Sequence, residues 1–79
     1  MSPTLFYENR YRFFFFSREE KRVHVHIMTS DGEAKFWLEP KIALAKNNGL
    51  SQTDLTEIEK IIRKRKNEIR TRWEKHFKS

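Results

Sequence analysis

The feature that most constrains this chain is a pair of alternating segments, 23–28 and 33–39, on either side of Asp31-Gly32. Apolar and polar residues alternate in both segments, which is the pattern of β-strands that bury one face. An Asp-Gly pair between two such segments is typical of a two-residue hairpin turn, because a type I′ turn needs positive φ at both central residues. The sequence therefore predicts an antiparallel hairpin in which Ser30 faces Glu33.

This register sorts the side chains of the two strands into an apolar face and a second, more polar face. The expected pairs are Ile27–Phe36 and Val25–Leu38 on the apolar face, and His26–Trp37 and His24–Glu39 on the other. A slip of one residue would mix the two sets, which favours the chosen register. We expect the apolar face to pack against a helix, and the face with the two histidines to be covered by a partner or a substrate.

Further strands are predicted before and after the hairpin. Thr4–Glu8 and Tyr11–Ser17 are rich in aromatic residues, with Asn9-Arg10 as the turn between them. Alternation within Phe13–Phe16 puts two phenylalanines on each face of the sheet, and the sequence leaves open which pair joins the histidines. The segment 41–48 fits either a short strand or a helical turn.

The C-terminal part of the chain predicts one long amphipathic helix over about residues 52–78. Ser51-Gln52-Thr53-Asp54 is close to a capping box, which marks the start of a helix. Apolar residues then recur at helical spacing within an arc of about 100°, the width of a face that packs on a core. They are Leu55, Ile58, Ile62, Ile69, Trp73 and Phe77. Arg65-Lys66 interrupt this stripe, and their long stems can follow the edge of the core.

Together these elements predict a single α+β domain over residues 1–79, in which a small antiparallel sheet of four or five strands carries one long C-terminal helix on one face. The strand-rich part is 4–39, and a connection over 40–50 leads to the helix. The chain has no cysteine, which excludes disulfides and thiolate metal sites. It has no signal-peptide pattern and no apolar run that could span a bilayer, so we expect a soluble cytoplasmic protein without a membrane partner.

The chain is basic, and its excess charge is concentrated in the predicted helix. The formal net charge is +6, and residues 57–79 alone contain nine Lys or Arg against four Glu, a net +5. Such a segment favours a polyanion or an acidic protein as the partner, although a mixed, solvated helix face has the same composition. The candidate phosphate-binding residues on this helix are Lys60, Arg63, Lys64 and Arg70.

The histidine face offers a second set of candidates. The candidate catalytic residues are His24, His26 and Glu39, and the candidate binding residues on the same face are Lys35 and Trp37; Arg12, whose face is left open, is a further candidate binding residue. Histidine is suited to proton transfer near neutral pH, and a cation beside it can steady the charge that develops on a phosphodiester. We favour the interpretation that the histidines have a structural or interface role and that the tryptophan is a binding anchor. His-x-His supplies two ligands where zinc normally takes three or four, so we predict no metal and no cofactor.

Four short motifs occur in one order along the chain. They are Tyr11–Ser17, His24-Val25-His26, Gly32–Pro40 and Asn48–Ser51, followed by the long helix. The combination resembles a small prokaryotic family known as domain of unknown function 4160, and the resemblance covers residues 3–78. The sequence departs from the family at Arg18–Arg22, where a small or proline-containing turn is expected. The resemblance implies one component of a toxin–antitoxin-like module, often encoded beside a second small protein.

The sequence and the resemblance together predict a small basic binding protein of a two-component toxin–antitoxin-like module, which pairs with the small protein encoded next to it. DNA or RNA and a second copy of this chain are left open as further partners. The alternative, from the enzyme class, is a small ribonuclease-type toxin that uses His24, His26 and Glu39 in acid–base cleavage.

Overall fold

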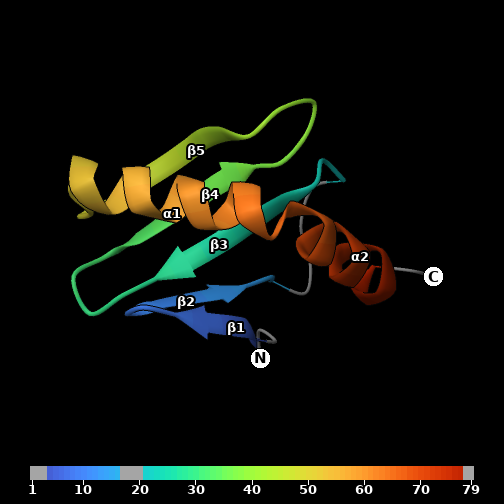
Figure 1. Ribbon diagram of the computed structural model, residues 1–79, viewed down its shortest axis with the longest axis horizontal. Helices are drawn as coiled ribbons and strands as arrows, with labels where there is room; N and C mark the ends of the chain where they lie inside the picture. Colours follow the sequence, from blue (N-terminus) through green and yellow to red (C-terminus); the bar gives the residue numbers. More distant parts are fainter. Residues whose placement is uncertain (1–3, 17–20, 78–79) are drawn as a thin grey trace.

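The computed structural model describes residues 4–16 and 21–77. Within these residues the chain forms one antiparallel sheet in the strand order β1-β2-β3-β4-β5, together with two helices (Figure 1). The elements are β1 (Thr4–Glu8), β2 (Tyr11–Phe14), β3 (His24–Met28), β4 (Glu33–Trp37), β5 (Ala43–Asn48), α1 (Gln52–Lys64) and α2 (Lys66–His76). The predicted α+β class is confirmed, and the segment left open, 41–48, contains the edge strand β5. The second strand ends at Phe14, earlier than the predicted Ser17, which itself lies outside the described residues.

Both helices lie on one side of the sheet, where they bury its apolar face (Figure 1). The buried core consists of Tyr11, Phe13, Phe15, Val25, Ile27, Ala34, Phe36 and Leu38 from the strand region, Leu50, and Leu55, Ile58, Ile61, Ile62, Ile69 and Trp73 from the helices. The predicted contact between the Val25 face and the apolar stripe is therefore confirmed. Because Phe13 and Phe15 belong to the core, Phe14 belongs to the opposite face, where it pairs with His26.

The predicted register of the β3–β4 hairpin is wrong by two residues. The observed pairs are His24–Trp37, Val25–Phe36, His26–Lys35 and Ile27–Ala34. The loop Thr29–Gly32 joins the strands, and the Thr29 N–H donates to the Gly32 carbonyl at 2.9 Å. Gly32 is needed for close packing and not for a type I′ turn, because a Cβ there would lie 2.0 Å from the Asn48 carbonyl oxygen. A shift of two residues keeps every side chain on its face, so the predicted separation of the faces survives.

The prediction of one long helix is wrong, because the helix is divided at Arg65. This residue has φ −110° and ψ 21°, outside helical values, and α2 turns away toward the end of the sheet where β3 begins (Figure 1). The Arg65 guanidinium lies 3.4 Å from the centre of the Phe6 ring and binds Glu8 at 3.0 Å and Glu68 at 2.9 Å. A cation in the apolar stripe is costly to bury, and the bend gives it partners at the edge of the core. The predicted helix end at residue 78 lies outside the described residues.

The start of α1 is tied to the sheet by a capping box and a buried tyrosine. Ser51 Oγ accepts a hydrogen bond from the Asp54 N–H at 3.1 Å, and Asp54 Oδ2 accepts one from the Ser51 N–H at 3.4 Å, so the predicted cap is confirmed. Asp54 Oδ1 also accepts from the Tyr11 hydroxyl at 3.0 Å and from Arg10 at 2.8 Å. Burial acts to raise the pKa of Asp54, but the hydrogen bonds from Tyr11, Arg10 and Ser51 outweigh it, and the pKa is lowered.

The core assignment predicts a large loss of stability for Ile62→Ala. Ile62 is fully buried between α1 and the sheet, and a large-to-small change at such a site costs about 2–5 kcal/mol. Lys60→Ala, on an exposed position of the same helix, is the matched control and should change stability by less than about 0.5 kcal/mol. Urea unfolding of both variants measures the difference, and equal effects would contradict the packing of α1.

The link between Asp54 and the sheet predicts a stability effect that depends on pH. Asp54→Asn keeps an oxygen for the cap but removes the charge that Arg10 binds. Because the folded-state pKa of Asp54 lies below its unfolded value of about 3.8, the carboxylate stabilises the fold above that pH and loses this contribution as the pH falls through the lowered value. Urea unfolding should therefore show a lower midpoint for the variant at about pH 7, and a smaller difference at about pH 2.5. A difference of the same size at both pH values would show that charge has no part in it.

Candidate functional site

We call the sheet face opposite the core that α1 covers the open face; α2 reaches one end of it, where the Trp73 ring packs on His24. The strand pairing places on it Thr4, Tyr7, Arg12, Phe14, His24, His26, Met28, Glu33, Lys35, Trp37, Ala43, Lys46 and Asn48. Tyr7 is 69 % exposed and Met28 38 %, while Phe16, which follows β2, is 40 % exposed. Large apolar side chains gathered on one exposed face mark an interaction surface.

Aromatic rings form a continuous cluster on the open face. Phe14 is almost fully buried, and its ring stacks on the imidazole of His26 with the centres 5.5 Å apart. The Phe16 ring also contacts the imidazole of His26, with the ring centres 4.4 Å apart. Since Phe14 supports the imidazole and Phe16 remains exposed, Phe16 is the ring of this cluster that a partner can reach.

Basic side chains lie directly over these rings. The Arg12 guanidinium is 4.5 Å from the centre of the Phe14 ring. Arg22 and Lys35 lie 4.2 Å and 4.5 Å from the centre of the Trp37 ring. Cations over aromatic faces are held by the ring quadrupole, so the rings fix the positions of these charges. The predicted binding residues Arg12, Lys35 and Trp37 are therefore parts of one surface.

A hollow of about 200 Å³ lies within the open face. Phe16, His26, Glu33, Ala34, Lys35, Lys46 and Asn48 line it. Lys46 pairs with Lys35 across β4 and β5, so two ammonium groups and one imidazole surround a small space. Among the described residues that line this hollow, the single carboxylate is that of Glu33.

The three predicted catalytic residues lie in three different environments. His24 is fully buried, with its Nδ1 2.7 Å from the Arg22 carbonyl oxygen and its ring 4.9 Å from that of Trp73 in α2. The imidazole of His26 is 5.1 Å from that of His24 but faces the hollow. Glu39 Oε2 binds Arg70 at 2.8 Å, toward the helices. Across residues 4–16 and 21–77, no three histidine or carboxylate side chains are grouped as metal ligands.

The predicted phosphate-binding residues of the helices are largely engaged in ion pairs. Arg63 binds Glu59 at 2.7 Å, Lys64 binds Glu8 at 2.7 Å, and Arg70 binds Glu39. Lys60 is exposed on α1. Exposed pairs of this kind are weak, but a phosphate would have to compete with a carboxylate for each of the three paired cations.

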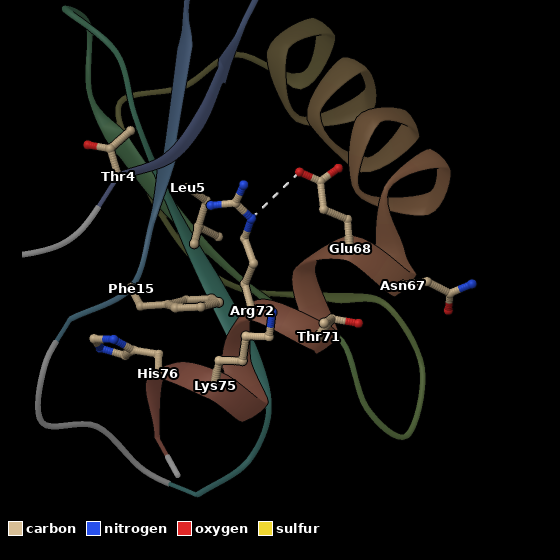
Figure 2. Close-up of a pocket in the computed structure, with 9 residues that line it drawn as sticks. All are labelled: Thr4, Leu5, Phe15, Asn67, Glu68, Thr71, Arg72, Lys75 and His76. Atoms are coloured by element: carbon tan, nitrogen blue, oxygen red, sulfur yellow. Dashed lines mark ion pairs between the residues drawn. The ribbon is translucent and has the colours of Figure 1, made fainter.

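A second hollow, of about 660 Å³, lies between β1 and α2, and we call it the β1–α2 groove (Figure 2). It is lined by Thr4, Leu5, Phe15, Asn67, Glu68, Thr71, Arg72, Lys75 and His76. Leu5 and Phe15 supply an apolar surface, and Arg72 lies 3.7 Å from Glu68 at the rim. Sequence reasoning missed this groove, because it exists only where the bend at Arg65 brings α2 beside β1. The i, i+4, i+8 spacing of Asn67, Thr71 and Lys75 is the signal that could have indicated a polar face on α2.

Comparisons with known proteins identify the family of the chain. No curated protein and no solved structure matches it significantly. In the part of the chain that the structure describes, no helix has the length and apolar composition needed to cross a membrane. The family described as domain of unknown function DUF4160 matches residues 11–74, from β2 through most of α2. This match confirms the resemblance found in the sequence motifs. The chain belongs to the DUF4160 family.

Proposed function

We propose that this protein is a binding protein of a two-component toxin–antitoxin-like module, and that it pairs with the small protein encoded next to it. The module is what the family resemblance suggests. The observation that supports a protein partner is the β1–α2 groove, which is larger than the hollow of the open face and lies beside a sheet edge.

The edge of β1 suits an extended segment of the partner. β1 is the first strand in the sheet order, so no described strand pairs with its outer edge. A peptide can add to such an edge through main-chain hydrogen bonds, while alternate side chains enter a neighbouring pocket. Leu5 and Phe15 provide an apolar surface for such a side chain.

The charges around the groove indicate the composition of that segment. Arg72 and Lys75 line the groove together with one carboxylate, Glu68. Arg65 binds both oxygens of Glu68, at 2.9 Å and 3.0 Å, so the groove keeps an excess of positive charge. The segment that fits best is therefore an extended one with an apolar residue flanked by acidic residues.

RNA cleavage is the second candidate function, and the hollow of the open face is the observation that favours it. His26 lies there beside Lys35 and Lys46, a combination that could move a proton and steady a phosphate. His24 is buried and Glu39 binds Arg70, so this activity would depend on His26 alone among the three predicted catalytic residues. Growth arrest by the chain expressed alone, abolished by His26→Ala, would support it.

Pairing through the groove predicts a charge-sensitive complex. The chain and the neighbouring product should co-purify, and Lys75→Glu should weaken the complex at least about tenfold, because it places a carboxylate against acidic residues of the partner. Lys60→Glu is the matched control: it makes the same charge change at an exposed position of α1 that lies outside the groove. Calorimetric titration of the two variants with the partner measures both affinities.

Two results would contradict this proposal. If the two lysine variants lose the same affinity, the groove has no special part in the complex. If Trp37→Ala weakens the complex more than Lys75→Glu, the interface lies on the open face, as the sequence predicted.

A further inference from the structure

The geometry of the open face points to a second binding function, and we infer that this face binds single-stranded nucleic acid. The inference goes beyond the proposed pairing, because the residues of the open face that carry it, apart from Thr4, do not line the β1–α2 groove. Single strands are bound by cations that follow the backbone and by aromatic rings on which bases stack. The open face presents both.

One row of side chains crosses the whole sheet on this face. The strand pairing links Thr4 to Phe14, Phe14 to His26, His26 to Lys35, and Lys35 to Lys46. With neighbouring strands about 4.8 Å apart, the row is about 19 Å long. It passes from a hydroxyl through two rings to two ammonium groups, so ring contacts and charge contacts lie next to each other along one line.

Exposed rings are available at two places beside this row. Phe16 is 40 % exposed and rests on His26, which Phe14 supports from below. Tyr7 is 69 % exposed and pairs with Arg12 on the adjacent row. A ring that is held by neighbours loses little freedom when a base stacks on it, and such stacking does not depend on base identity.

The cations of the open face are held in place by aromatic rings. Arg12 lies over Phe14, and Arg22 and Lys35 lie over Trp37. Arg22 also donates from Nε to the Glu39 carbonyl oxygen at 2.7 Å. Lys46, which lines the hollow beside Lys35, adds a fourth basic residue. Cations beside exposed rings are the combination that binds the backbone and the bases of a single strand.

The combination favours a single strand over a duplex. A duplex hides the faces of its bases, so the exposed rings would have no partner in it. Protein partners also use aromatic anchors, and an acidic protein is the occupant that remains if neither strand binds. RNA and DNA single strands share the required chemistry, and the experiment separates them.

Fluorescence anisotropy with labelled 12-nucleotide RNA and DNA strands and the matching duplexes tests the inference. The protein should bind single strands at least about tenfold more tightly than duplexes, and its affinity should fall about 10- to 1000-fold between low and moderate salt. Phe16→Ala should weaken binding about 5- to 150-fold, which is the range that loss of one stacking contact gives. Lys46→Glu should weaken it about tenfold and reduce the dependence on salt.

Two matched controls separate this surface from the others. Lys60→Glu on α1 and Lys75→Glu in the groove should each change the affinity for single strands by less than about twofold, because neither lies on the open face. The complex with the neighbouring protein should still form with Phe16→Ala. The failure of one proposal is thus distinguishable from the failure of the other.

Several outcomes would overturn the inference. They are no binding of either strand at low salt, equal affinity for single strands and duplexes, and a loss from Lys60→Glu as large as that from Lys46→Glu. Amide shifts in spectra of the wild-type protein give an independent reading that needs no variant. Added single strand should shift residues of β2 to β5, and shifts confined to α1 would place the site on the helix instead.

Discussion

A cation in the middle of an apolar helix stripe cannot enter the core, and both of the proposed binding surfaces depend on how Arg65 is accommodated. Its guanidinium lies over Phe6 and binds Glu8 and Glu68, while the backbone leaves helical geometry at this residue. The bend carries α2 to the end of the sheet, where Trp73 covers His24. It also brings α2 beside β1 and so creates the groove.

The sequence predicted the two faces of the sheet correctly even though the hairpin register was wrong. Alternation has a period of two residues, so a register error of two leaves Val25 and Ile27 in the core and His26 on the other face. An Asp-Gly pair indicates a two-residue turn, whereas the loop here runs from Thr29 to Gly32. Gly32 instead allows the backbone at Asn48 to pass close by. Because Asn48 belongs to a strand distant in the sequence, the residues around Gly32 carry no pattern that predicts this contact.

The candidate site was predicted in part, for a related reason. Strand alternation alone predicts that Lys35 and Trp37 share a face, and the structure keeps them together. The face of Arg12 depends on the pairing of β2 with β3, which alternation leaves open and the structure places on the same surface. Alternation does not report what covers the end of a strand, so the burial of His24 by Trp73 could not be predicted. Counting charges along the sequence also does not show which helix cations form ion pairs. Lys64, for example, binds Glu8, which is 56 residues away in the sequence.

The two edges of the sheet differ in a way that bears on assembly. β5 exposes Lys46, Asn47 and Asn48, and polar and charged side chains along an edge strand discourage a further strand. Both edge strands carry an irregularity in their pairing, β1 between Thr4 and Phe6 and β5 opposite Lys35 and Phe36. Asn47 also turns its amide inward, to the backbone of Leu50. The proposed pairing uses the other edge, at β1. Each copy of this chain then takes up one strand of the partner, and the sheet of the chain itself offers no second edge of equal quality.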